Sequence, residues 1–293
     1  MAGPEFFLYL PQLRMSVDDV TARAVAAERA GFAGIAFMDH LAPPLAPTSP
    51  MWEAMTLATW VAARTTRLRV GHLVLCDALR HPAVLARQAV TLDHASGGRF
   101  ELGLGWGSVP DELAAYGVTG DGPADRVARL GETLEVLEAL WTGEPVEYRG
   151  RFFTVDCEGQ QPAPLDRIPL VIGGAGPRTL ALVRSHADWW NLPTYAAERL
   201  EELRPAAGQA RVSTQHLVAW VPDPPRRDEV VGLAERRYGA MGGLVAGDGA
   251  ELRDRFGSLA GQGVDRCYVW FADFAPPDTL ASFGDQVIGP ISR

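Results

Sequence analysis

The sequence contains no lysine. All 27 of its basic side chains are arginines, set against 36 aspartates and glutamates in a chain of 293 residues. Schiff-base aldolases and pyridoxal-phosphate enzymes need a lysine amine, and a Walker-type loop needs a lysine beside the phosphates, so these three classes are excluded. Any anion that the protein binds is therefore held by arginine side chains or by backbone N–H groups.

Cysteine is also scarce. Cys76, Cys157 and Cys267 are odd in number, lie far apart, and form neither a CxxC pair nor a zinc-binding spacing. This pattern is typical of a protein that works in the reducing cytoplasm without a structural metal, and we expect both for this chain.

Long apolar runs and an excess of positive charge are missing too. No stretch approaches the ~20 apolar residues of a membrane helix, and the N-terminal MAGPEFFLYLPQ lacks the basic segment that begins a signal peptide. The formal net charge of −9 argues against nucleic acids and anionic membranes as partners. The expected partner is a small-molecule substrate.

Short apolar runs alternate with helical patterns along the chain, and eight of them read as strands buried on both faces. These runs are Phe6–Leu10, Gly34–Met38, Leu68–Leu75, Arg99–Leu104, Ile168–Ile172, Ala187–Asn191, Gln215–Val221 and Arg266–Phe271. The alternation predicts an α/β fold, a (β/α)8 TIM barrel that forms one domain over residues 1–293, with ligands at the C-terminal ends of the strands. The rival, a dinucleotide-binding doubly wound sheet, needs a GxGxxG turn after the first strand, and PQLRMS is not one.

The connection between the fourth and fifth strands is too long for an ordinary loop. It carries an amphipathic helix, Ala124–Trp141, and a hairpin-like stretch, Val146–Val155. We interpret residues 105–165, approximately, as an insertion over the barrel mouth. Arg126 and Arg129 share one face of its helix, which predicts either a solvated face or a contact with an anionic ligand tail.

Two glycine-rich stretches follow predicted strands. The turn Gly103-Leu104-Gly105-Trp106-Gly107 ends the fourth strand, and Gly173-Gly174-Ala175-Gly176-Pro177-Arg178 leads from the fifth strand into a helix. Glycines let the backbone approach a ligand closely, and a helix start offers free N–H groups to an anion. The second stretch therefore predicts a phosphate site to which Arg178 adds charge. Trp106 stacks on the ligand or walls the pocket.

Polar and aromatic side chains end other strands. Asp39 and His40 follow the second strand, where a histidine can exchange a proton near neutral pH. Trp220 and Trp270 end the last two strands, where they line a substrate pocket or pack in the core.

These motifs, in this order, resemble the bacterial luciferase-like superfamily, and most closely its branch dependent on coenzyme F420, an 8-hydroxy-5-deazaflavin. The resemblance covers nearly the whole chain. Its motifs are Pro11-Gln12, Ala30-Gly31-Phe32, Met38-Asp39-His40, Thr66–Gly71, Arg80-His81-Pro82, Ser96–Arg99, Gly103–Gly105, Leu140–Gly143, Tyr148–Phe152, Ile172–Arg178 and Ala187–Asn191. Relatives that use FMN share many of these motifs, so FMN is the alternative cofactor.

The resemblance implies a reduced cofactor at the barrel mouth, hydride transfer and a homodimer. It implies that the cofactor ring lies against Leu73 and Val74, where similar proteins have a non-prolyl cis peptide. It also implies that Asp39 accepts a hydrogen bond from the ring and that His40 is catalytic. The cofactor-binding residues predicted in this way are Asp39, Leu73, Val74, Gly105, Trp106, Gly107, Gly173, Gly174, Ala175, Gly176 and Arg178.

The chain departs from some F420-dependent dehydrogenases after the fourth strand. Those enzymes carry a proton-donating glutamate where this chain has Ser108. The resemblance therefore does not favour sugar-phosphate dehydrogenation. Asp111 and Glu112 lie close by and are interpreted as partners of a helix dipole.

The resulting hypothesis is a coenzyme F420-dependent oxidoreductase that transfers a hydride between the deazaflavin and a small organic substrate. The reacting bond is C=C, C=N or C=O, or an alcohol in the opposite direction. Two alternatives stay open: an FMN-dependent monooxygenase of the luciferase type, and a non-catalytic flavin- or deazaflavin-binding protein. The sequence identifies neither the substrate nor the direction of transfer.

Overall fold

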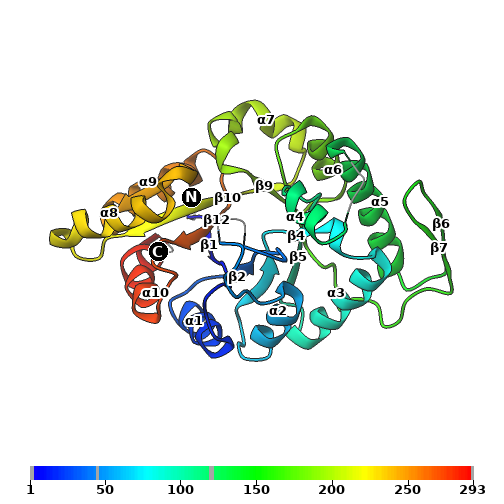
Figure 1. Cartoon of the computed structure of the whole chain (residues 1–293), viewed down its shortest axis with the longest axis horizontal. Helices are drawn as coiled ribbons and strands as arrows, with labels where there is room; N and C mark the ends of the chain where they lie inside the picture. Colours follow the sequence, from blue (N-terminus) through cyan, green and yellow to red (C-terminus); the bar gives the residue numbers. More distant parts are fainter. Residues whose placement is uncertain (1–2, 44–45, 119–121, 292–293) are drawn as a thin grey trace.

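A closed barrel of parallel strands forms the centre of the molecule. The structure, a computed structural model, describes residues 3–43, 46–118 and 122–291. In this part of the chain, eight parallel strands pair in a ring that closes between β9 and β10. They are β1 (Glu5–Leu10), β2 (Gly34–Phe37), β3 (Arg69–His72), β5 (Phe100–Gly105), β8 (Leu170–Gly173), β9 (Trp189–Leu192), β10 (Arg211–Trp220) and β12 (Arg266–Phe271). Figure 1 views the ring with helices around it, so the predicted (β/α)8 fold is confirmed.

Two short strands modify the ring at its C-terminal end. After β3, strand β4 (Leu75–Cys76) resumes the pairing with β5. Strand β10 pairs with β9 only up to Thr214, and from Leu217 onward it pairs with β11 (Leu244–Gly247) instead. The ring therefore divides beside Gln215, which opens the barrel where ligands bind in this fold.

The surrounding helices begin where the sequence signals indicate. Ser16 and Asp19 form a capping box at α1, and Pro82, Pro123 and Pro177 occupy first turns. The outer α-helices are α1 (Val17–Arg29), α2 (Ala54–Ala62), α3 (Pro82–Ser96), α5 (Pro123–Trp141), α6 (Pro177–His186), α7 (Leu200–Ala207), α8 (Arg227–Tyr238), α9 (Gly249–Gly261) and α10 (Pro277–Phe283). Shorter helical turns are η1 (Asp77–Leu79), α4 (Pro110–Ala115), η2 (Thr194–Arg199), η3 (Pro224–Arg226), η4 (Gly239–Met241), η5 (Gly284–Ile288) and α11 (Gly289–Ile291). Among the described residues, no helix has the length and apolarity to cross a membrane.

The segment expected as an insertion over the mouth divides into three parts. Of its described residues, those at the beginning, Gly105–Leu113, lie at the mouth, where α4 sits beside the pocket. Helix α5 instead packs between α3 and α6, in the outer ring of helices. The antiparallel hairpin of β6 (Val146–Arg149) and β7 (Thr154–Cys157) projects from the outside of the barrel, at the right of Figure 1. Amphipathicity alone cannot separate a ring helix from a covering helix, because each buries one face.

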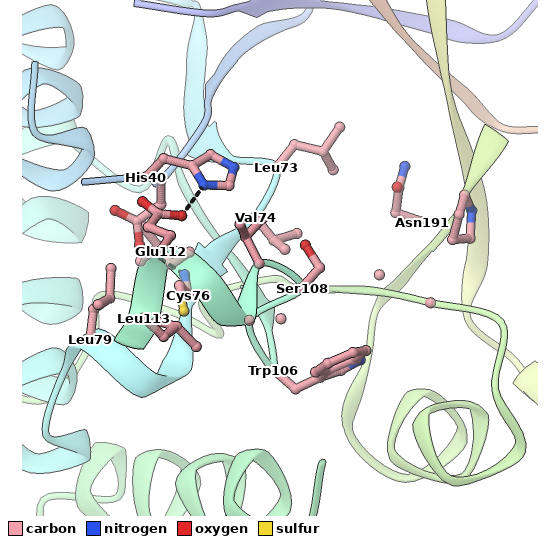
Figure 2. Close-up of a pocket in the computed structure, with 18 of the residues that line it drawn as sticks. His40, Leu73, Val74, Cys76, Leu79, Trp106, Ser108, Glu112, Leu113 and Asn191 are labelled. Carbon is pink, nitrogen blue, oxygen red and sulfur yellow. Dashed lines mark hydrogen bonds and ion pairs between the residues drawn. The ribbon is translucent and has the colours of Figure 1, made fainter. Parts of the chain in front are cut away.

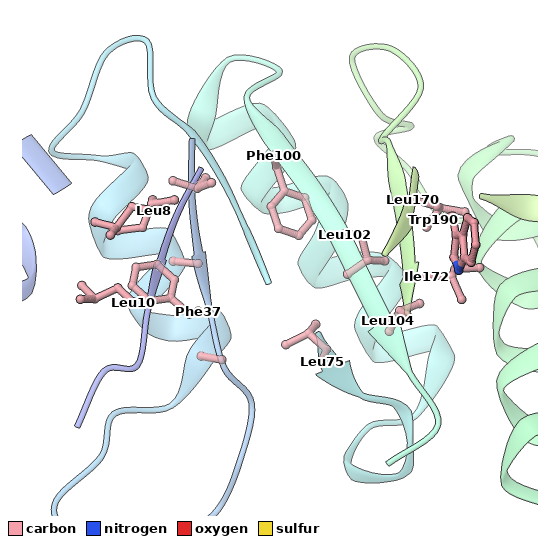
Figure 3. Packing of buried hydrophobic residues seen from close by; sticks show 14 of the residues in the cluster. Leu8, Leu10, Phe37, Leu75, Phe100, Leu102, Leu104, Leu170, Ile172 and Trp190 are labelled. Carbon is pink, nitrogen blue, oxygen red and sulfur yellow. The ribbon is translucent and has the colours of Figure 1, made fainter. Parts of the chain in front are cut away.

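Alternating side chains of the strands separate two cores. On β1, Phe6, Leu8 and Leu10 pack in the layer beneath the helices, whereas Phe7 and Tyr9 belong to a cluster inside the barrel. Figure 3 shows the outer layer along neighbouring strands, from Leu8 to Trp190.

Candidate active site

A pocket with a cavity volume of about 280 Å³ lies at the C-terminal ends of the strands. Nine of the predicted site residues line it: Asp39, His40, Leu73, Val74, Gly105, Trp106, Gly107, Gly173 and Gly174. They lie just after β2, in the break between β3 and β4, and at or just after the ends of β5 and β8. The topology thus brings together strand ends that lie far apart in sequence. Figure 2 shows His40, Leu73, Val74 and Trp106 around one space.

The wall formed by Leu73 and Val74 depends on glycines in β5. The Leu73–Val74 peptide is cis, as the resemblance implied. A Cβ at Gly103 would clash with the carbonyl oxygen of His72, and one at Gly105 would lie 2.6 Å from a methyl group of Val74. These two positions have no room for a side chain, so glycine allows β5 to pack directly against the bent segment.

His40 has a carboxylate partner. Its Nδ1 lies 2.7 Å from Oε2 of Glu112, on α4 (Figure 2). The other oxygen of Glu112 accepts hydrogen bonds from the backbone N–H of Leu41, at short range, and of Ala42, at 3.1 Å. The side chain of Glu112 is only 10% exposed. Glu112 therefore fixes both the ring of His40 and the chain that follows it.

Asp39 is engaged by the protein itself. Its carboxylate makes a two-point ion pair with Arg80, at 2.5 and 2.9 Å, and accepts the N–H of Cys76 at 2.8 Å. Arg80 also contacts Glu53, at 2.6 Å. Burial alone would raise the pKa of Glu53, but hydrogen bonds from Thr56, Met55 and Arg80 lower it to about 2. Asp39 lines the pocket, yet its main structural partner is Arg80.

The glycine loop after β8 enters the pocket only in part. Gly173 and Gly174 line the pocket, and Gly174 has a φ of +143°, which a side chain would rarely adopt. Ala175 is buried in the outer core, whereas Gly176 and Arg178 lie exposed at the start of α6. Gly176 is the N-cap and has no side chain to cap the helix, so no side-chain oxygen bonds the N–H groups there.

A second hollow adjoins the pocket across Trp106 and Leu113 and has a cavity volume of about 710 Å³. Arg126 and Arg129 of α5 line it. Arg126 is 9% exposed, stacks over the ring of Trp106 at 5.2 Å, and has no hydrogen-bond partner for Nε among the described residues. Arg129 pairs with Asp77 at 2.8 Å. These arginines thus do not form a simple solvated face.

Sequence reasoning missed several residues of the site. Glu112 reads in the sequence as a helix-dipole partner, and no local pattern indicates that Cys76, Asn191 and Gln215 line the pocket or that Arg80 pairs with Asp39. The only available signals were motif membership for Arg80 and Asn191. Burial raises the pKa of the Cys76 thiol to about 11, so it is not a thiolate nucleophile at neutral pH.

The fold is that of a TIM-barrel protein, and its pocket lies at the C-terminal ends of the strands with a histidine–glutamate pair at the edge. Residues 4–265 match the family described as luciferase-like monooxygenase. The chain belongs to this family.

Individual relatives agree with this assignment. An F420-dependent glucose-6-phosphate dehydrogenase of Nakamurella multipartita is 36% identical over 171 residues, which is 56% of this chain but only 49% of that protein. An uncharacterized protein of Mycobacterium tuberculosis is 30% identical over 67% of this chain and 75% of its own length. Among solved structures, an F420-dependent secondary alcohol dehydrogenase in complex with an F420–acetone adduct superposes with a TM-score of 0.85 at 18% identity, covering all of both chains.

Proposed function

We propose that the protein is a coenzyme F420-dependent oxidoreductase that transfers a hydride between the deazaflavin and a small organic substrate. The observation that carries this proposal is the His40–Glu112 pair, at 2.7 Å, on the edge of a pocket with glycine-rich walls. The F420-dependent dehydrogenase among the relatives supports the choice of cofactor, although the matched segment spans about half of that protein.

The residues present fit a flat ring with an anionic extension. Val74 and Leu73 offer an apolar wall, and β5 cannot carry side chains at Gly103 and Gly105 that would intrude on it. When bound, the deazaflavin supplies two-electron hydride chemistry. The ring would be held by Leu73, Val74, Gly105 and Gly107. Asp39, held by Arg80, would accept a hydrogen bond from it.

The anionic extension has two candidate sets of donors. Gly173, Gly174, Ala175 and Gly176 lead into the start of α6, where backbone N–H groups and Arg178 suit a phosphate. The hollow beside Trp106 presents the buried Arg126, whose Nε lacks a partner among the described residues. A carboxylate or phosphate there would satisfy that donor, because buried polar groups are costly when unpaired.

His40 would hold or move the proton that accompanies the hydride. Since Nδ1 faces the carboxylate of Glu112, the neutral imidazole donates from Nδ1, which leaves Nε2 to exchange a proton with the substrate. Glu112 positions the ring through this contact. The pocket walls exclude water and fix the orientation of the reacting groups.

The first test is a fluorescence titration of the purified protein with oxidised coenzyme F420 and, in parallel, with FMN. Tight binding of F420 and weak binding of FMN would support the proposal. A preference for FMN would reject it in favour of a monooxygenase that uses reduced flavin and oxygen. His40→Ala then separates an enzyme from a binding protein: turnover should fall on the order of 100-fold or more with cofactor affinity retained.

We propose further that residues 1–293 act as one domain, in the cytoplasm and as a homodimer. Support for a dimer comes from large apolar side chains exposed on the neighbouring helices α2 and α3, with Trp60 at 40% and Val84 at 55% exposure. The mass in solution, measured by light scattering, tests this directly. A mass of about 31.6 kDa, that of one chain, would contradict it.

A further inference from the structure

Another cavity, which we call the substrate chamber, opens beside the proposed cofactor pocket. Its cavity volume is about 430 Å³, and His40 and Gln215 line both spaces. A ligand in this chamber therefore reaches the side chain to which we assign proton transfer. We take this chamber as the site of the substrate, an assignment that rests on the proposed function.

Aromatic rings form one wall of this substrate chamber. Trp270 lies edge to face with Tyr9, at 5.9 Å between ring centres, and with Tyr238, at 5.1 Å. Phe274 continues the wall, 6.4 Å from Tyr238. Met38 and other apolar side chains complete the lining. Such a wall binds a flat hydrophobic body better than a flexible polyol.

Two arginines give the chamber its charge. Arg14 comes from the loop after β1 and Arg237 from the last turn of α8. No aspartate or glutamate lines the chamber in the described ranges, and neither arginine has an ion-pair partner there. Arg14 donates from Nε to Ser49 at 2.8 Å, and Arg237 from Nη1 to the carbonyl of Ala272 at 3.1 Å. In each arginine the hydrogen bond occupies one nitrogen.

The two charges act on the same end of the chamber. Burial raises the pKa of the Tyr238 hydroxyl, the positive charges of Arg237 and Arg14 oppose that rise, and the negative charge of Asp273 adds to it. Both guanidinium groups therefore lie near one tyrosine. Arg14 and Arg237, which have no ion-pair partner in the described part of the chain, thus bring positive charge to one end of the chamber, although the chain as a whole has a net charge of −9. This local charge favours a ligand that carries a negative group.

Backbone strain is concentrated at the same chamber. Among the described residues, three non-glycine positions have left-handed φ values: Arg14 at 56°, Phe274 at 64° and Ala275 at 53°. Arg14 and Phe274 both line the chamber. Each is held by hydrogen bonds, from Arg14 N to Pro50 O at 2.9 Å and from Phe274 N to Phe271 O at 3.0 Å. Such strained backbone positions cluster at active sites and ligand clamps.

We propose that the substrate is a flat, hydrophobic ring compound that carries a carboxylate or a similar oxyanion. The anion binds Arg14 and Arg237, the ring lies on the aromatic wall, and the reacting bond faces His40. In reduction, that double bond gains a hydride from the reduced cofactor and a proton through His40, and the cofactor is left oxidised. In oxidation, the corresponding alcohol or saturated bond loses the same hydride and proton.

The test compares two probes of the same shape, the anion cinnamate and its neutral amide, cinnamamide, which lacks the charge and has an NH2 donor in place of one oxygen. Binding is measured by calorimetry to the full-length protein, with and without saturating oxidised F420. Cinnamate should bind at least tenfold more tightly, because charge-assisted hydrogen bonds are stronger than neutral ones. Glucose 6-phosphate should displace it only weakly, because its phosphate can meet the arginines but its sugar cannot pack on the aromatic wall.

Variants locate the source of the preference. Arg14→Gln and Arg237→Gln should each reduce the cinnamate preference several-fold, and the double variant should abolish it. Arg236→Gln is the matched control, because Arg236 is exposed on the same helix and does not line the chamber. Thermal unfolding of each variant verifies that it is folded.

Two results would overturn the inference: equal affinities of the wild-type protein for the two probes, or a preference that survives in the folded double variant. The F420 titration separates this inference from the proposed function. If F420 fails to bind while the preference for cinnamate persists in the cofactor-free protein, the proposed function is rejected and the anion specificity of the chamber stands.

Discussion

At the scale of single residues, the central contact is the one between His40 and Glu112. One oxygen of Glu112 meets Nδ1 of His40 at 2.7 Å, and the other accepts from the backbone N–H of Leu41 and Ala42. The carboxylate therefore holds the imidazole and the backbone beside it in one arrangement. We assign Glu112 as a positioning residue, because its contacts are with His40 and the adjacent backbone.

Glu112→Gln tests this assignment. The amide oxygen can still accept the two backbone N–H groups, but the negative charge beside His40 is lost. We expect kcat to fall roughly 10- to 100-fold with a changed pH profile, while the affinity for F420 stays within about threefold. Asp111→Asn, on the exposed side of the same turn, is the control and should leave all three quantities unchanged. An unaltered pH profile in Glu112→Gln would show that the contact is only structural.

The sequence predicted His40 and the glycines because each shows its chemistry at its own position in a motif. Glu112 lies 72 residues from its partner, and Arg80 lies 41 residues from Asp39. Neither pairing has a local pattern, since both depend on how the strand ends and α4 are arranged in the closed barrel. A charge-based interpretation of Glu112 as a dipole partner was reasonable locally, but the fold gives that carboxylate three specific donors.

At the scale of elements, the site depends on the packing of β5 against the segment between β3 and β4. The strands themselves were predictable to within a few residues, because strands buried on both faces are almost continuously apolar. The short strand β11 was not, since a run of four residues has no measurable period. The irregularity at Leu73–Val74 followed from the family resemblance and not from periodicity.

Gly103→Ala should damage this packing. The new Cβ would clash with the backbone carbonyl of His72, which cannot move away as a side chain can. We expect a loss of about 2–4 kcal/mol in the free energy of unfolding, measured by urea denaturation, together with weaker F420 binding. Gly257→Ala is the matched control, because nothing lies within 4 Å of its Cβ position on α9. It should stabilise the protein by about 0.5–1 kcal/mol. Equal effects of the two substitutions would refute the packing argument.

At the scale of the whole molecule, charges are buried at both ends of the barrel. Opposite the pocket, the fully buried Arg266 pairs with Glu101 at 2.5 Å and with Glu5 at 3.1 Å, and it stacks on Trp189 at 3.5 Å. Removing one partner of such a group leaves an uncompensated charge, which typically costs 3–5 kcal/mol. Glu101→Gln should therefore lower the melting temperature clearly. Glu147→Gln in the exposed hairpin should not.

Two buried histidines make the stability of the barrel depend on pH. Burial lowers the pKa of His72 to about 4, against the opposing charge of Asp39, and burial with the charge of Arg255 lowers that of His216 to about 4. Neither nitrogen of His72 has a hydrogen-bond partner within the described residues. Both side chains are thus neutral in the folded protein at pH 7, as they are in the unfolded chain.

The sign of the effect follows from proton binding. Below pH 6.5 the two histidines become protonated in the unfolded chain, whereas in the folded protein they stay neutral down to about pH 4. The free energy of unfolding therefore falls as the pH decreases through this window. The slope should approach about 1.4 kcal/mol per pH unit for each histidine. Glu53 has a pKa of about 2 in the folded protein, so its contribution to stability is lost only below its unfolded pKa of 4.5. From pH 6.5 to 5 the histidines therefore cause the loss of stability, while the buried carboxyl of Asp77, whose pKa burial raises, acts in the opposite direction.

Urea denaturation at pH 7, 6 and 5 measures this slope. His72→Leu should make the decline shallower by roughly half, because one of the two buried groups can no longer titrate in the unfolded chain. His94→Gln, at an exposed position on α3, should leave the slope of the wild-type protein almost unchanged. If the wild-type protein and His72→Leu lost stability in parallel over this range, the buried His72 would not be a source of acid sensitivity, and the decline would have to come from groups elsewhere in the barrel.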